Sequence, residues 1–143
     1  MIKFPFTKEY NISYIDNLPY KLLSTIDENN IDLELREIFD NGIRVYKSYR
    51  YSELILFGTI FEPVCYLWFA DDLLLSICYE LENRYFEMFK EGINSELPDG
   101  LELKEDPLQD GNPLTVYLDD IVEIYLQKLN ENFILFKVAY YPR

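Results

Sequence analysis

The residues that come closest to known catalytic chemistry are two pairs of adjacent carboxylates, Asp71-Asp72 and Asp119-Asp120. Two carboxyl groups that face each other can perform the acid–base chemistry of glycosidases. Adjacent acids are, however, also ordinary residues of solvated turns. The chain contains no histidine, which removes the most common general base and excludes Ser–His and Cys–His nucleophilic pairs. We therefore expect that the protein is not an enzyme and has no catalytic residues.

The sequence contains no convincing metal or cofactor site. Asp110 and Gly111 can be aligned with the middle of an EF-hand calcium loop. Leu108 and Tyr117 then fall at two ligand positions, the second of which needs a carboxylate. The five glycines are scattered and form no phosphate-binding loop. We expect neither a metal nor a cofactor.

The N-terminal sequence lacks the apolar run of a signal peptide. The longest apolar stretch, Val64–Ala70, is far shorter than the roughly 20 residues that a membrane span needs. These features predict a cytoplasmic protein without a membrane partner. In a reducing cytoplasm we expect Cys65 and Cys78 to be free thiols rather than a disulfide, and two cysteines without histidine do not make a zinc site.

Charge is the most uneven property of the sequence, whose 143 residues include 13 Lys and Arg against 26 Asp and Glu. The net charge of −13 argues against direct nucleic-acid binding, because phosphate backbones need basic side chains. Between residues 91 and 123, Lys104 is the single basic residue among ten acidic ones. We expect this region to form one negative surface that attracts a basic partner. The candidate partner-binding residues are Glu96, Asp99, Glu102, Glu105, Asp106, Asp110, Tyr117, Asp119, Asp120 and Glu123.

Residues 83–97 have the clearest helical pattern. Phe86, Phe89, Ile93 and Leu97 recur at the spacing of one helix face. Asn83 is the expected N-cap, and the Pro-Asp-Gly sequence at 98–100 ends the helix.

Residues 30–40 support two interpretations. Ile31, Leu35 and Ile38 recur at helical spacing, and Asn41-Gly42 is a typical helix end. The alternation of Ile31, Leu33 and Leu35 with charged residues fits a strand, in which case Asn41-Gly42 is a hairpin turn. The helix is the favoured interpretation. Another short helix is expected near residues 20–26, in an N-terminal segment that is otherwise hard to interpret.

Alternating patterns rich in β-branched and aromatic residues predict strands at 43–50, 53–62, 64–70, 73–81, 114–118, 121–129 and 133–141. Asp71-Asp72 forms a two-residue turn, and the register that follows from it pairs Cys65 directly with Cys78. The hairpin is apolar on both faces, with Trp68, Ile77 and Leu81 opposite Cys65, which also admits a homodimer.

The last predicted hairpin is different, because its two faces differ in polarity. Six apolar side chains share its core face, and Glu123, Gln127 and Lys137 lie on the other, which we expect to be solvated. Residues 98–113 form a long acidic loop. The whole chain, residues 1–143, is thus predicted as a single α+β domain: a mostly antiparallel, meander-like sheet of six or seven strands with one or two helices packed on one face.

The size, the acidity and the strand sequence Tyr66-Leu67-Trp68-Phe69-Ala70-Asp71-Asp72, followed by the 83–97 helix, resemble the small acidic immunity proteins of bacterial polymorphic and contact-dependent toxin systems. The resemblance implies an inhibitor that binds one basic toxin domain, such as a nuclease, and blocks it. No functional residue is carried over from it.

Two other functions stay open. An anti-defence or anti-CRISPR inhibitor that mimics nucleic acid needs carboxylates at the regular spacing of phosphates. A small ligand-binding domain needs a large apolar pocket with a few convergent polar groups.

Overall fold

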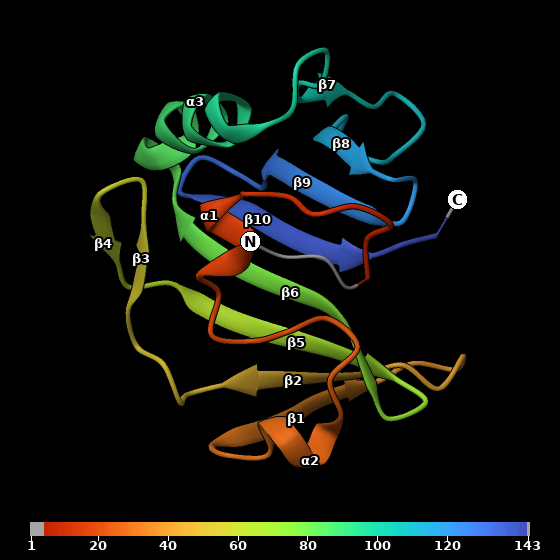
Figure 1. Cartoon of the computed structure of the whole chain (residues 1–143). Helices are drawn as coiled ribbons and strands as arrows, with labels where there is room; N and C mark the ends of the chain where they lie inside the picture. The colour runs from red at the N-terminus through yellow and green to blue at the C-terminus, as the bar shows by residue number, and fades with distance from the viewer. Residues whose placement is uncertain (1–4, 143) are drawn as a thin grey trace.

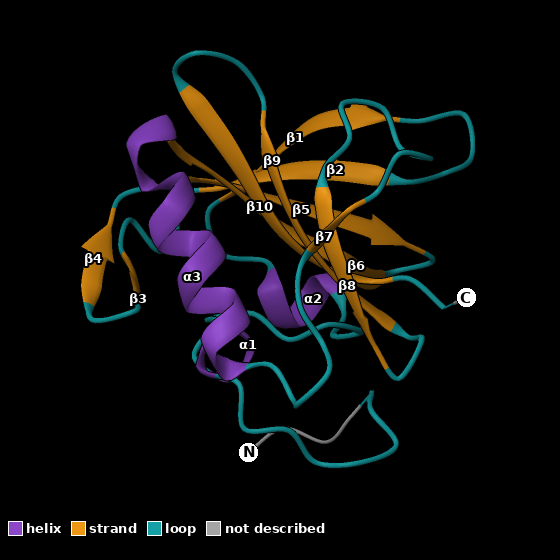
Figure 2. Ribbon diagram, turned by 90° about the horizontal axis from the view of Figure 1, so that it is seen from above, coloured by secondary structure: helices purple, strands orange, loops and turns teal. Residues whose placement is uncertain are grey.

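Eight strands form one antiparallel sheet in the computed structural model, which describes residues 5–142 (Figure 1). Helices lie against one face of this sheet (Figure 2), so the predicted α+β class is confirmed. The strands, in the order in which they lie side by side, are β1 (Leu33–Ile38), β2 (Arg44–Ser48), β5 (Val64–Ala70), β6 (Leu73–Glu82), β10 (Phe133–Tyr140), β9 (Val122–Lys128), β8 (Leu114–Leu118) and β7 (Lys104–Glu105).

The remaining elements are a small separate hairpin and three short helices with a 3-10 turn. They are β3 (Leu54–Leu56), β4 (Thr59–Phe61), α1 (Ser13–Asp16), α2 (Ile26–Asn29), η1 (Asn83–Tyr85) and α3 (Phe86–Glu96). Within residues 5–142, no helix is long and apolar enough to span a membrane.

The core lies between one face of the sheet and the layer formed by α3, the N-terminal segment and the β3–β4 hairpin. Phe89 and Ile93 on α3 are fully buried, as the helical stripe predicted. The six apolar residues predicted for the core face of the last hairpin are fully buried as well: Val122, Ile124, Leu126, Ile134, Phe136 and Val138. Asn83 does not cap α3 but begins the 3-10 turn η1 that precedes it.

Gly92 lets α3 approach the β3–β4 hairpin. Phe57, in the turn of that hairpin, packs its ring against α3 and lies 5.2 Å from the ring of Phe89. A Cβ atom added at Gly92 would lie 2.5 Å from Cδ1 of Phe57. The glycine is therefore explained by this close packing, although it weakens the helix itself.

Gly92→Ala is expected to lower the free energy of unfolding by about 1 kcal/mol, because the overpacking against Phe57 outweighs the gain in helix propensity. Chemical denaturation measures this difference. Glu91→Ala, at the exposed neighbouring position, is the control and should change stability little. A stabilising effect of Gly92→Ala would show that the Phe57 ring moves aside freely.

The helix predicted for residues 30–40 is wrong, and the alternative interpretation is correct. Residues 33–38 form β1, which pairs antiparallel with β2 across a turn at Asn41-Gly42. Gly42 has φ +88°, and Asn41 Oδ1 accepts a hydrogen bond from the Ile43 amide. The apolar residues at helical spacing stay largely exposed, Ile38 at 57%. Non-local pairing with β2 therefore overrides the local helical pattern.

Two other predictions need correction. Residues 53–62 form two short strands rather than one, because the chain reverses at Phe57-Gly58, where both residues have positive φ. The helix near residues 20–26 is wrong: the one helical turn begins at Ile26, after a capping box in which Thr25 and Glu28 bond each other's backbone amides.

The register of the β5–β6 hairpin is correct at its turn and wrong beyond it. Ala70 pairs with Leu73 as predicted, but a bulge next to Trp68 shifts the remaining pairs by one residue. Cys65 therefore pairs with Tyr79 instead of Cys78, and successive strand residues point to opposite faces. The two cysteines are free thiols on opposite faces of the sheet, and burial raises the pKa of each thiol to about 12.

The bulge also explains how the hairpin hides its apolar residues. Ile77 pairs directly with Leu67, and both are buried in the core. Leu81 was expected on the other face and is likewise buried in this core. The face away from the helices keeps Trp68, Ser76 and other half-buried residues.

Candidate partner-binding surface

The ten candidate residues separate into two groups. Some make hydrogen bonds that hold the fold together: Glu96, Asp106, Tyr117, Asp119 and Glu123. The others are exposed carboxylates: Asp99, Glu102, Glu105, Asp110 and Asp120.

Glu96, the last residue of α3, holds α1 in place. Its Oε1 accepts a hydrogen bond of 2.9 Å from the Ser13 amide, and its Oε2 accepts one of 2.6 Å from the Ser13 hydroxyl. Because α1 is a single helical turn, it depends on such contacts and not on its own propensity. The Glu96 carboxylate is therefore engaged within the molecule.

Asp119 anchors the N-terminal segment in the same way. Its carboxylate accepts hydrogen bonds from the Thr7 amide and hydroxyl, both at 2.9 Å, and from the Tyr10 hydroxyl at 2.5 Å. Partial burial raises the pKa of Asp119, but the bonds from Tyr10 and Thr7 and the charge of Lys8 outweigh it, so the net pKa is lowered. Burial, the bond to Asp119 and its charge raise the pKa of Tyr10.

Asp119→Asn is expected to release residues 5–10 and to lower the free energy of unfolding by about 1 kcal/mol, a modest value because the site is only partly buried. The folded-state pKa of Asp119 is lowered, so its contribution is present at neutral pH and is lost as pH falls below 3.8. Hydrogen exchange of the Thr7 amide measures both effects. Asp120→Asn, at the exposed neighbouring position, is the control; equal exchange in both variants would rule out this anchor.

Glu123 is the most buried charged residue of the described chain. Only 2% of the residue is exposed. Its Oε2 accepts hydrogen bonds from the Tyr117 hydroxyl at 2.6 Å and from Gln109 Nε2 at 3.1 Å. Its Oε1 lies 3.4 Å from Lys137 Nζ, and that ammonium lies 4.2 Å from the centre of the Tyr125 ring. Burial and the charge of Glu123 raise the pKa of Tyr125.

This cluster corrects the prediction that Glu123 and Lys137 face solvent. The segment between β7 and β8 covers Glu123 through Gln109, which also donates to Asp106 Oδ2 at 2.9 Å, and Gln127 Nε2 donates to the Asp110 carbonyl. The Lys137 side chain is 24% exposed. The predicted loop 98–113 thus contains the short strand β7 and is anchored over the sheet. Gln109 and Lys137 were not among the predicted site residues. Lys137 could have been found, because it is the single basic residue of the apolar strand β10 and Glu123 is the single acidic residue of the neighbouring strand β9.

The five exposed carboxylates lie on β7 and on the connections around β7 and β8, and we call them the acidic edge: Asp99, Glu102, Glu105, Asp110 and Asp120. β7 is the last strand of the sheet, at the top of Figure 1. Within residues 5–142, Lys and Arg form salt bridges with Glu34, Glu82 and Glu123, so none of them forms a salt bridge with the acidic edge. Its charges are therefore available to a partner.

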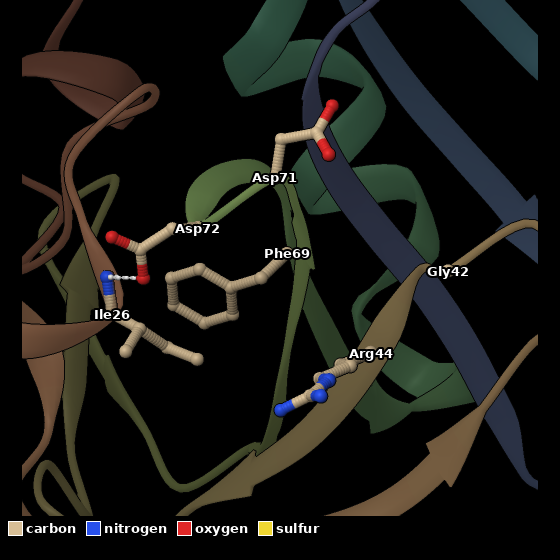
Figure 3. Close-up of a pocket in the computed structure, with 6 residues that line it drawn as sticks. All are labelled: Ile26, Gly42, Arg44, Phe69, Asp71 and Asp72. Carbon is tan, nitrogen blue, oxygen red and sulfur yellow. Dashed lines mark hydrogen bonds between the residues drawn. The ribbon is translucent and has the colours of Figure 1, made fainter.

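The Asp71 and Asp72 carboxylates do not face each other. A hollow of about 360 Å³ beside Asp71-Asp72 is also lined by Arg44 and Phe69. Figure 3 shows the Asp71 and Asp72 carboxylates pointing in different directions, with Asp72 accepting a hydrogen bond from the Ile26 amide at 3.4 Å. Among residues 5–142, no three His, Cys, Asp or Glu side chains gather as a set of metal ligands.

The chain matches no protein-family model, and neither a curated protein nor a solved structure is significantly similar to it. The arrangement of its own side chains is therefore the basis for a functional proposal.

Proposed function

We propose that this protein inhibits a basic protein, such as a nuclease toxin domain, by binding it through the acidic edge, as an immunity protein does. The observation that carries the proposal is the absence of Lys or Arg partners for these carboxylates within residues 5–142. Unpaired surface charges of one sign attract a partner of the opposite sign and raise the association rate.

The structural carboxylates support the proposal indirectly. Asp119 and Glu96 hold the N-terminal segment and α1, and Glu123 holds the loop that carries Asp110. A rigid presentation of charge lowers the entropy that a binding surface loses in a complex. We favour a protein partner over nucleic-acid mimicry because the acidic edge lies on loops, a turn and a two-residue strand, whereas mimicry needs a regular repeat.

Reversing the acidic edge with Glu102→Lys, Glu105→Lys and Asp110→Lys is expected to slow association with the basic partner by about tenfold or more at low salt. The partners to test are the basic proteins encoded beside this chain's own gene, first by survival on co-expression and then by stopped-flow binding across a salt series. The matched control is Glu53→Lys, Glu62→Lys and Glu131→Lys, which changes the net charge equally at exposed positions elsewhere. Equal rates for the two triple variants, or no protection by the wild-type chain, would contradict the proposal.

A further inference from the structure

A hollow of about 320 Å³ lies on the face of the sheet away from the helices, and we call it the trough. Its floor follows from strand register. Trp68 pairs with Ser76, Ser76 pairs with Ala139, and Ala139 pairs with Glu123. Directly paired residues project from the same face, so two small side chains lie between a tryptophan and the buried carboxylate. The trough is the space that these small residues leave.

One wall of the trough is held rigidly. The Trp68 indole stacks on Phe39, from the β1–β2 connection, with ring centres 5.3 Å apart and planes inclined by 29°. Stacking fixes the orientation of the indole before anything binds. A preordered aromatic wall loses little entropy on binding, and tryptophan is among the residues most enriched in binding hot spots.

The charge at the end of the trough is already balanced. Lys137 lines it, but its ammonium is engaged by Glu123 and by the Tyr125 ring. An anionic ligand would have to compete with Glu123 for this ammonium. The trough therefore suits a neutral, flat apolar group better than an anion.

One residue of the acidic edge, Asp120, lies near the trough. Tyr141, which is 57% exposed, forms its other wall. The Tyr141 amide donates a 2.7 Å hydrogen bond to the Ile121 carbonyl, next to Asp120 of the acidic edge. A ligand in the trough that also carried positive charge would have the exposed Asp120 close to this wall.

We propose that the trough binds an aromatic side chain of the basic partner, flanked in that partner by Lys or Arg. This inference rests on the proposed function and names the anchor of the same interface. The ring lies on the Ser76–Ala139 floor against Trp68, and a flanking cation reaches toward Asp120 of the acidic edge. Burying one ring provides a short-range anchor, which long-range charge attraction alone does not supply.

The test uses Trp68 fluorescence, because Trp68 is the single tryptophan of the chain. The probes are three capped peptides: Lys-Lys-Phe-Lys-Lys, Lys-Lys-Ala-Lys-Lys and Ser-Ser-Phe-Ser-Ser. We expect the first peptide to change the Trp68 emission and to bind about tenfold more tightly than either of the others, since a factor of ten corresponds to one modest anchor.

Two variants, Ala139→Leu and Ser76→Leu, each place a larger side chain on the floor of the trough. If one of them fails to fold, the other still tests the proposal. Each variant is expected to lower the affinity for the Lys-Lys-Phe-Lys-Lys peptide to that for the Lys-Lys-Ala-Lys-Lys peptide. Ser52→Leu, which adds the same apolar group at an exposed site, is the control.

The outcomes separate the two proposals. If the Lys-Lys-Phe-Lys-Lys and Lys-Lys-Ala-Lys-Lys peptides bind equally tightly, and the trough-filling variants do not change this, the proposed aromatic anchor is wrong. The proposed binding through the acidic edge would not be affected by that result. Equal binding of the two Phe peptides, unaffected by the acidic-edge reversal, would support the trough and contradict the charge-based function. If N-acetylphenylalaninamide alone binds as tightly as the basic Phe peptide, the occupant is a small aromatic molecule and the proposed protein anchor is wrong.

Discussion

Replacing Phe136 with alanine is expected to lower the free energy of unfolding by about 3–5 kcal/mol. Phe136 on β10 is fully buried. The rings of Tyr14, Tyr79 and Phe89 surround it at centre distances of 6.4, 6.3 and 5.4 Å. These rings come from α1, β6 and α3, so they cannot all move inward to fill the cavity. The loss of stability therefore includes both the transfer free energy of the ring and the energetic cost of the cavity left behind.

Urea denaturation measures this loss, and Phe133→Ala is the matched control. Phe133 begins the same strand but is 45% exposed. Its truncation should cost far less, because little of its surface is removed from water. A similar loss in the two variants would mean that the ring cluster between the sheet and α3 is not packed as described.

Replacing Glu123 with leucine is expected to cost about 3 kcal/mol, because it leaves the Lys137 ammonium without its counter-charge. It also removes the acceptor of the Tyr117 and Gln109 hydrogen bonds. The double variant Glu123→Leu with Lys137→Met should recover most of the loss, because an apolar pair of similar size removes the unpaired charge. Thermal and urea unfolding of both variants give the comparison.

The control for this pair is the exposed ion pair between Arg84 and Glu82, whose side chains are 67% and 63% exposed. Glu82→Leu should cost well under 1 kcal/mol, because solvent screens that pair. No recovery in the Glu123–Lys137 double variant would show that the hydrogen bonds, and not the charge pair, account for the loss.

Glu123 also connects stability with the proposed function. Through Gln109 it holds the segment between β7 and β8, which carries Asp110 of the acidic edge. Loosening this segment would increase the entropy lost on binding. The Glu123→Leu variant should therefore bind the basic partner less tightly even at temperatures at which it stays folded.

Much of the fold could be predicted from the sequence because its signals are local. Strand β5 agrees with the predicted range, and α3 agrees with the stripe of Phe89 and Ile93. The alternation in the last hairpin correctly identified its buried face. These patterns repeat within a few residues and do not depend on which other element lies opposite.

Which strands pair, and in which register, could not be predicted in this way. Residues 33–38 carry a pattern that suits both a helix and a strand, and pairing with β2 decided between them. The bulge beside Trp68 separated Cys65 from Cys78 by a single residue of register. A shift of one residue exchanges the two faces of a strand, so face assignments far from the turn depend on contacts that the local sequence does not encode.

The sequence by itself determined the α+β class, the main strands, helix α3 and the excess of acidic residues between 91 and 123. Tertiary structure alone decided which of those acids are engaged within the fold, as Glu96, Asp119 and Glu123 are, and which remain on the acidic edge. The physical reason is that periodicity records whether a residue is apolar, whereas the environment of a carboxylate depends on donors that are as many as 112 positions away along the chain.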